Sequence, residues 1–373
     1  MNANYKTVCK PNLCNGCEAC VEICGKNAIH IEDYLSKLNA VINSEMCVGC
    51  GRCFSVCPNN HAPLFRMPIA WYEGWSSSDK TRCMSSSGGA AAALSVAFVR
   101  QGGVVCSCAP QDMTFGFSFA HTEEEVNKFA GSKYVKSNPF GVYDEIKKYI
   151  IQKKPVLFIG LPCQVAAVQN YVGQSDYLYT ADLICHGTPS AKLLEMYLTE
   201  RGYHIADLQK LKFRANTHFY LSYDGHAIEP LGVYGRYTTA FLRGVDYTEN
   251  CYSCSFAQTK RVSDLTLGDS WGSEMPLDER NKGISLILCQ TERGEKLLSF
   301  SDLYVIPADK EKAVSSNKQL LHPTAKSSKT EKFFFELEKH KHFNRAIMRT
   351  APKTFIRQNI KTILLKLKAL FVK

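Results

Sequence analysis

Short apolar runs alternate with helix-like segments through the middle of the chain. Each run is bounded by glycine, proline or polar residues, which is typical of buried strands. The predicted strands are Val104–Cys108, Pro155–Gly160 and Tyr177–Ile184. The predicted helices are Ala90–Arg100, Val165–Tyr171 and a third that starts at Ser190. Strands that alternate with helices in this way indicate an α/β domain from residue 80 to about residue 325.

The two ends of the chain have different patterns. Near the N-terminus, Ala28–Glu32 and Ala40–Ile42 are short alternating stretches joined by a polar turn, and they predict a β-hairpin. The segment with Trp71 and Trp75 is interpreted as a linker. Near the C-terminus, apolar residues fall on one face of a predicted amphipathic helix: Phe355, Ile356, Ile360, Ile363, Leu364, Leu367, Leu370 and Phe371.

Composition places the protein in a broad class. With 373 residues, of which 45% are hydrophobic and 21% charged, the chain resembles an ordinary globular protein of two or three domains. Residues 1–10 contain no apolar run of the kind found in secretion signals. The longest apolar stretch, Ala90–Val99, is much shorter than the ~20 residues that span a bilayer. The expected location is the cytoplasm, or the periphery of the inner membrane face.

The formal net charge of +10 is confined to the tail. Ten basic residues and no acidic residue follow Glu338, namely Lys339, Lys341, Arg345, Arg349, Lys353, Arg357, Lys361, Lys366, Lys368 and Lys373. Because the rest of the chain is close to neutral, the charge does not indicate a nucleic-acid partner. A basic amphipathic helix suits an anionic membrane surface, and the alternative is docking on the core or on a partner subunit.

Two cysteine motifs dominate the N-terminal region. The spacing C-x2-C-x2-C-x3-C occurs twice, and in this arrangement the fourth cysteine of each motif ligates the other cluster. The first 4Fe–4S cluster is predicted to bind Cys14, Cys17, Cys20 and Cys57, and the second Cys47, Cys50, Cys53 and Cys24. Structural zinc is the alternative, although zinc sites rarely use this arrangement twice. Residues 1–65 are therefore predicted to form a ferredoxin-like domain.

A third group of cysteines lies in the α/β region. Cys163 and Cys185 each follow a predicted strand, where open α/β sheets place ligands, and Cys251 and Cys254 form a C-x2-C pair. These four are candidates for a third 4Fe–4S cluster, against structural zinc or unrelated buried thiols. The remaining cysteines are expected to be core thiols: Cys9, Cys83, Cys106, Cys108 and Cys289.

A loop of small residues precedes the predicted helix at Ala90. Ser87, Gly88 and Gly89 would present free N–H groups at the helix N-terminus, which suits a phosphate, and the alternative is close packing of the helix on its neighbour. His186 directly follows Cys185 and is a candidate proton donor, because imidazole titrates near neutrality. The alternative for His186 is a structural hydrogen bond.

The motifs RCMSSSGGAAAAL, GSKY, FIGLPCQVAAV, DLICHGTPS, CYSC and LTLGDSWG follow the ferredoxin-like region in that order. This set resembles the family of the coenzyme F420 hydrogenase and dehydrogenase beta subunits. The resemblance implies an iron–sulfur flavoprotein that binds FAD. It also implies that Ser87, Gly88, Gly89, Ser132, Lys133 and Tyr134 contact the flavin, and that Lys133 stabilises negative charge on the reduced ring unless it is a solvated lysine. Asp269, Trp271 and Gly272 match a further family motif.

The predicted fold is a small ferredoxin-like domain (1–65), a larger mixed α/β flavin and iron–sulfur domain (66–325) and a basic tail with an amphipathic helix (326–373). The predicted function is an oxidoreductase that relays electrons between the clusters and, through FAD, a small hydride donor or acceptor such as coenzyme F420. Its expected protein partner is a ferredoxin or another redox protein. The alternatives are a non-catalytic electron-transfer subunit and a membrane-surface redox accessory in polysaccharide or lipid modification.

Overall fold

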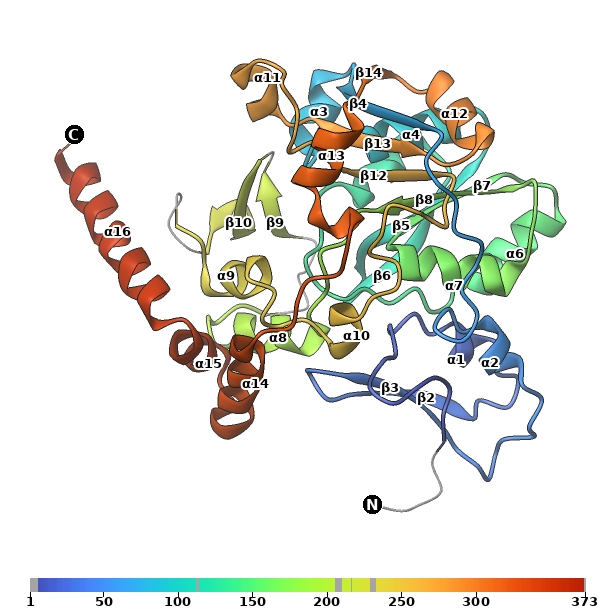
Figure 1. Ribbon diagram of the computed structural model, residues 1–373, viewed down its shortest axis with the longest axis horizontal. Coiled ribbons are helices and arrows are strands. Elements are labelled where there is room, and N and C mark those ends of the chain that lie inside the picture. Colours follow the sequence, from blue (N-terminus) through green and yellow to red (C-terminus); the bar gives the residue numbers. More distant parts are fainter. Residues whose placement is uncertain (1–5, 112–113, 205–209, 216, 229–232, 372–373) are drawn as a thin grey trace.

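The computed structural model describes residues 6–111, 114–204, 210–215, 217–228 and 233–371 (Figure 1). Figure 1 shows a small N-terminal module in blue, a large sheet with its helices above it, and C-terminal helices in red that extend away from the body. Within the described residues, none of the helices has the length and apolar character needed to cross a membrane.

The N-terminal module is built on a three-stranded sheet in the order β1-β3-β2. Its elements are β1 Lys6–Thr7, α1 Ala19–Glu22, β2 Ile29–Asp33, β3 Leu38–Ile42 and α2 Arg52–Val56. Strands β2 and β3 pair antiparallel from Ile29 opposite Ile42 to Asp33 opposite Leu38, which confirms the predicted hairpin. The two short helices lie within the two cysteine motifs, and both pack against α7 (Pro162–Val172) of the larger domain.

The larger domain is organised around an eight-stranded sheet in the order β14-β4-β13-β12-β8-β7-β5-β6. The strands are β4 Ala70–Ser76, β5 Val104–Gln111, β6 Thr114–Ala120, β7 Val156–Gly160, β8 Leu178–Leu183, β12 Leu265–Asp269, β13 Ser285–Cys289 and β14 Leu303–Pro307. Strands β5, β7, β8 and β12 are mutually parallel, and the other pairings are antiparallel. The predicted strands β5, β7 and β8 are confirmed, and their carboxyl ends meet at one edge.

Helices cover both faces of this sheet. On one face, α4 (Ala90–Arg100), predicted with these bounds, shares a core with β5, β7 and β12. On the other, α6 (Tyr143–Ile151) and α7 share a core with the N-terminal module. The smaller helices around the sheet are α3 Asp79–Met84, α5 Glu123–Val126, α10 Glu249–Tyr252, α11 Leu277–Lys282, α12 Glu292–Ser299 and α13 Lys310–Ser316.

The prediction of a linker around Trp71 and Trp75 is wrong. These residues belong to β4, which is hydrogen-bonded to β13 on one side and β14 on the other. Gly74 permits this position, because a Cβ there would lie 2.2 Å from the carbonyl oxygen of Tyr304. The first element after the N-terminal module is therefore already a strand of the large sheet.

A helical lobe stands beside the sheet. It contains a second three-stranded sheet (β9 Leu211–Ala215, β10 His218–Tyr223, β11 His226–Ala227) and the helices α8 Ala191–Thr199, α9 Arg236–Leu242, α14 Ser328–His340, α15 Phe343–Thr350 and α16 Pro352–Phe371. Its core includes Tyr197, Tyr237, Phe333 and Phe343, all fully or almost fully buried. Helices α14 and α15 thus contribute to the core of the lobe, and α16 continues beyond it (Figure 1).

Candidate functional site

The first predicted cysteine group surrounds a small cavity in the N-terminal module. Cys14, Cys17, Cys20 and Cys57 all line it and all are buried. The Gly16 N–H donates to the Cys14 sulfur at 3.4 Å, as backbone amides do around thiolates in iron–sulfur sites. Gly16 has φ +70°, a backbone conformation that glycine adopts without strain.

Cys9 joins this group from outside the motifs. It lines the same cavity, and the Asn59 amide donates to its sulfur at 3.7 Å. The prediction of a buried thiol is confirmed for Cys9, but its neighbours are the four cysteines of the first group. Among the other unassigned cysteines, Cys106 and Cys289 are buried, Cys108 is half-buried, and Cys83 is exposed, so the prediction is wrong for Cys83.

The second group lies at the outer surface of the module. Burial raises the pKa of Cys53, and the nearby thiols of Cys24, Cys47 and Cys50 raise it further. Cys47 and Cys50 are exposed, and the large apolar side chains of the same segment, Met46, Val48 and Phe54, are also exposed. Cys53 in turn acts on the pKa of Cys20, so the two groups are adjacent.

The third group gathers four cysteines from three segments. Cys163 lies in the first turn of α7, although the sequence placed it in the preceding loop, while Cys185 follows β8. Burial raises the pKa of Cys163, and the thiols of Cys254, Cys185 and Cys251 raise it further. The same causes raise the pKa of Cys185 to about 12, so these thiols favour the neutral form unless a metal binds them.

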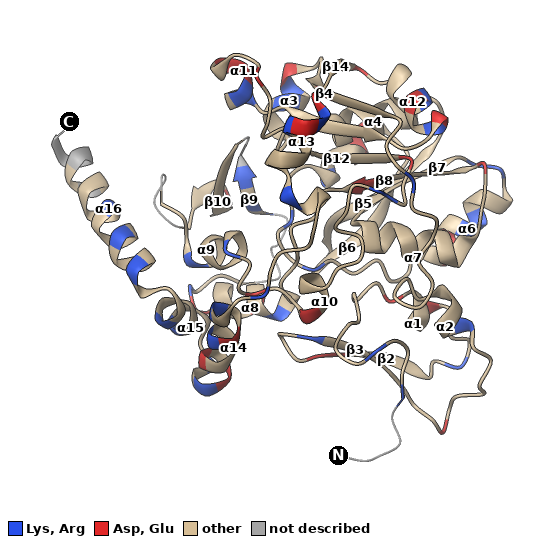
Figure 2. Ribbon diagram, viewed as in Figure 1, with Lys and Arg blue, Asp and Glu red and all other residues tan. Residues whose placement is uncertain are grey.

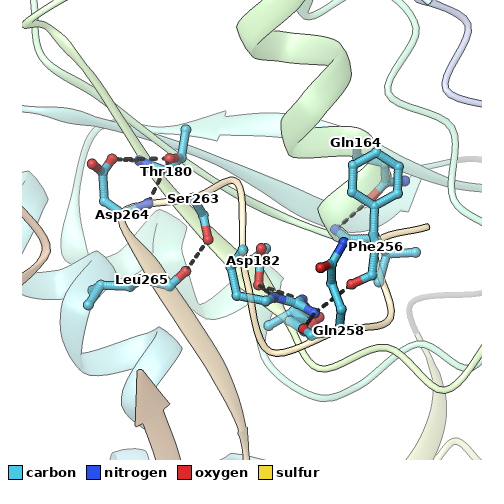
Figure 3. A network of polar contacts seen from close by, with 11 residues as sticks. Gln164, Thr180, Asp182, Phe256, Gln258, Ser263, Asp264 and Leu265 are labelled. Carbon is cyan, nitrogen blue, oxygen red and sulfur yellow. Dashed lines mark hydrogen bonds and ion pairs between the residues drawn. The ribbon is translucent and has the colours of Figure 1, made fainter. Parts of the chain in front are cut away.

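A buried arginine positions one of these segments. Arg261 pairs with Asp182 on β8 at 2.8 Å, and their side chains are 1% and 0% exposed. Its guanidinium also donates to the carbonyls of Phe256 and Leu183 at 2.9 and 3.0 Å. Figure 3 labels two of its partners, Asp182 and Phe256. The loop that follows Cys254 is thereby tied to the end of the strand that carries Cys185.

Two side chains connect the first and third groups. The Lys136 ammonium donates to the Asn15 carbonyl at 3.2 Å and also lowers the pKa of Cys163 and Cys185. The buried Tyr143 hydroxyl donates to the Cys17 carbonyl at 2.5 Å, and the nearby Cys163 thiol contributes to raising the pKa of Tyr143, which burial raises most. The three groups therefore follow one another from the exposed surface of the module into the larger domain.

A cavity of about 360 Å³ lies at the carboxyl edge of the parallel strands. Gly160, Leu183 and Gly268, at or next to the ends of β7, β8 and β12, line it together with Ser107 in the middle of β5. Cys185 forms part of its wall, which places the third cysteine group beside the cavity.

Most residues predicted to contact a flavin line this cavity, namely Ser87, Gly89, Ser132, Lys133 and Tyr134. The candidate proton donor His186 lines it as well. The Ser132 N–H donates to the Ser86 hydroxyl at 2.7 Å, which joins the two predicted segments. Gly88 is not among the lining residues. A Cβ there would lie 2.5 Å from the Gly74 carbonyl oxygen, so Gly88 serves the close packing of the loop on the sheet.

The sequence did not single out Arg214, which comes from β9 of the second sheet. Its guanidinium, 2% exposed, forms two bonds of 2.7 Å with the carboxylate of Asp269 at the end of β12. It also lies over the rings of Phe219 and Trp271, at 4.7 and 5.4 Å. Asp269 thus holds an arginine against the cavity wall beside two aromatic rings.

The hydrogen bonds of His186 fix its neutral tautomer. The Tyr247 hydroxyl donates its one proton to the Phe241 carbonyl at 2.6 Å. Its 2.6 Å contact with His186 Nδ1 therefore requires the proton on Nδ1 and leaves Nε2 as an acceptor. Because burial lowers the pKa of His186, the predicted role of proton donor requires a charged form that this environment disfavours.

Comparison with protein families identifies two regions. Residues 13–61 match the 4Fe-4S dicluster domain. Residues 153–305 match the family that describes the C terminus of the coenzyme F420 hydrogenase/dehydrogenase beta subunit. The chain carries both of these domains. The dicluster domain contains the first and second cysteine groups, and the beta-subunit domain contains the third group, His186, Arg214 and Asp269.

Several chains of solved structures match, and one of them is a distant likeness. A chain from the F420-reducing NiFe hydrogenase complex of Methanosarcina barkeri, studied by xenon derivatization, has 16% identity and a TM-score of 0.47, over 73% of this chain and 95% of that chain. No curated protein matches the chain significantly.

The thiols of the dicluster domain suit a pair of cubanes. The four sulfurs around a cubane bind different irons and stand farther apart than those on one zinc ion, where Zn–S bonds are about 2.3 Å. In the part of the chain that the structure describes, no group of three or more His, Cys, Asp or Glu side chains is placed to hold a single metal ion. The domain match supports two 4Fe-4S clusters.

Proposed function

We propose that this protein is an iron–sulfur flavoprotein oxidoreductase. Electrons would pass between the two clusters of the dicluster domain, a third cluster and FAD, which exchanges a hydride with an organic substrate such as coenzyme F420. The observation that carries the proposal is the position of Cys185. It belongs to the third cysteine group and also to the wall of the cavity that gathers the predicted flavin residues.

The cavity fits a dinucleotide in three respects. Gly89 is the N-cap of α4, and the small side chains of Ala90 and Ala91 leave space over the first turn of this helix. Two cations, Lys133 and Arg214, line the cavity and suit phosphate oxygens. The rings of Tyr134, Phe219 and Trp271 offer flat surfaces for stacking.

Within this site, FAD would supply the conversion between one-electron and two-electron chemistry. Asp269 orients the guanidinium of Arg214. The Lys133 ammonium donates to the carbonyls of Phe129 and Ala130 at 2.7 and 3.3 Å. Burial lowers the pKa of Lys133, so a bound anion would stabilise its charged form. His186 Nε2 would accept a hydrogen bond from a bound ligand.

Cofactor analysis after anaerobic purification tests the proposal. We expect about twelve irons and about one FAD per chain, since each cubane holds four irons. Replacing Ala91 by tryptophan should fill the cavity and remove the flavin while the iron content stays the same, because Ala91 belongs to the cavity and to none of the cysteine groups. Iron and flavin are measured on the same samples.

Ala91→Ser is the matched control, and it should retain the flavin. A wild-type protein with about eight irons and no flavin would overturn the proposal. A flavin that survives Ala91→Trp would show that it binds elsewhere. Reduced coenzyme F420, NADH and reduced ferredoxin are then compared as donors, because bleaching of the flavin by one of them assigns the substrate class.

The exposed apolar residues at the second cysteine group favour docking of a redox protein there. Val48 and Phe54 are 65% and 52% exposed and flank Cys50 in the sequence. The double variant Val48→Asp/Phe54→Asp should slow reduction by reduced ferredoxin at least tenfold, since two buried charges disfavour the complex. Reduction by dithionite, a small molecule that needs no docking surface, should be unchanged. Stopped-flow absorbance follows both reactions.

The matched control is Ile151→Asp/Leu277→Asp, which makes the same change at two exposed positions on α6 and α11. It should leave both rates unchanged. If the iron content of the Val48→Asp/Phe54→Asp variant falls, the double variant Val48→Ala/Phe54→Ala is tested in its place. Equal ferredoxin rates in the iron-replete variant and the wild type would contradict docking at this surface.

A further inference from the structure

The last helix, α16, presents its polar side to the body of the protein. On that side, the Thr354 hydroxyl accepts from Arg243 at 2.7 Å, and the Gln358 amide donates to the Thr239 hydroxyl at 3.2 Å. Phe355, at the start of the helix, is buried in the helical lobe. Thr354 and Gln358 thus face the body in the first two turns of α16, and Leu365 is half-buried further along the same side.

The opposite side of α16 is an exposed aliphatic stripe. It consists of Ile356, Ile360, Ile363, Leu364 and Leu367, which are 61%, 54%, 58%, 59% and 45% exposed. Their spacing of three and four residues places them on one face of the helix. Surface helices normally turn such a face to the core, so the orientation of α16 is the reverse of the usual one. Figure 1 shows the helix projecting from the lobe with open space along its length.

Positive charge accompanies this stripe. Lys353, Arg357 and Lys361 are exposed on the same helix. Figure 2 shows segments in the Lys and Arg colour along α16. No acidic residue follows Glu338 in the sequence. Protein interfaces usually carry charges of both signs at their rim, whereas a purely basic helix with an apolar face complements anionic lipid headgroups over a hydrocarbon layer.

We propose that α16 lies flat on an anionic membrane surface with its aliphatic stripe inserted below the headgroups. The helix has 20 residues and is therefore about 30 Å long at ~1.5 Å per residue. Its bonds to Thr239 and Arg243 on the other side fix the orientation, so membrane binding would require no rearrangement of the lobe. The attachment is peripheral, in keeping with the lack of a spanning helix in the described residues.

Vesicle flotation of the full chain tests this proposal. The vesicles contain either phosphatidylcholine alone or phosphatidylcholine with a third of phosphatidylglycerol. We expect the wild type to float with the anionic vesicles and at least tenfold less with the neutral ones. Ile360→Asp/Leu364→Asp should abolish flotation, and Arg357→Glu/Lys361→Glu should reduce it at least tenfold, with a further loss at high salt.

The matched control is again Ile151→Asp/Leu277→Asp, which should float like the wild type. Cluster absorbance of every variant checks that the fold is intact. Wild-type protein that stays in the soluble fraction with anionic vesicles would overturn the proposal. Unchanged flotation of the Ile360/Leu364 variant would overturn it as well. The same holds if sedimentation shows that the wild type is a dimer and that this variant is a monomer.

Discussion

Cys254→Ser is expected to lower the iron content from about twelve to about eight atoms per chain. Cys254 shares the third group with Cys163, Cys185 and Cys251, and its thiol raises the pKa of both Cys163 and Cys185. Loss of one thiolate leaves an incomplete ligand set for a cubane, while the two clusters of the dicluster domain remain. Iron and sulfide analysis measures the change, and EPR of the reduced protein should lose one of three signals.

The electron path should be interrupted at the same point. Since Cys185 lies in the wall of the cavity, the third cluster would be the one adjacent to the flavin. Ferredoxin should still reduce the remaining clusters of the variant, but the flavin should be reduced at least tenfold more slowly. Cys289→Ala is the matched control, because Cys289 is a buried thiol of β13 outside all three groups. A Cys254→Ser protein that keeps about twelve irons would refute the assignment.

The parts of the site that could be predicted are those with a local signature. Within each motif the cysteines lie only a few residues apart. The sequence alone therefore indicates the group of cysteines that the structure shows around the small cavity of the N-terminal module. Cys163, Cys185 and the loop at Gly89 follow strands or precede helices, and the carboxyl edge of a parallel sheet brings such positions together. Their assignment to a third cluster and a flavin remains a proposal.

The parts that could not be predicted depend on distant partners. Arg214 and Asp269 are 55 residues apart, and Arg261 and Asp182 are 79 apart. Each arginine resembles an ordinary surface residue until the sheets are assembled. The linker interpretation of β4 failed for a related reason. Ala70–Ser76 forms a strand because β13 and β14 pair with it, and both partners come more than 200 residues later.

Arg261→Met is expected to lower the free energy of unfolding by about 3–5 kcal/mol, because it leaves the Asp182 carboxylate buried without its partner. The carbonyls of Phe256 and Leu183 lose their donor as well. Since the loop after Cys254 is held by these bonds, the variant should also lose about four irons per chain. Urea unfolding and iron analysis measure the two effects.

Two further variants separate a lost charge pair from a general loss of packing. Arg261→Met/Asp182→Leu removes both charges and should recover most of the stability, because an apolar pair of similar volume often replaces a buried ion pair at little cost. Lys312→Met breaks an exposed pair with Glu274 and should change the free energy by less than about 1 kcal/mol. If Arg261→Met unfolds at the same urea concentration as Lys312→Met, the buried pair does not hold the segment. If the double variant regains stability but not iron, the guanidinium bonds to the loop carbonyls, rather than the charge balance, place Cys254 beside Cys185.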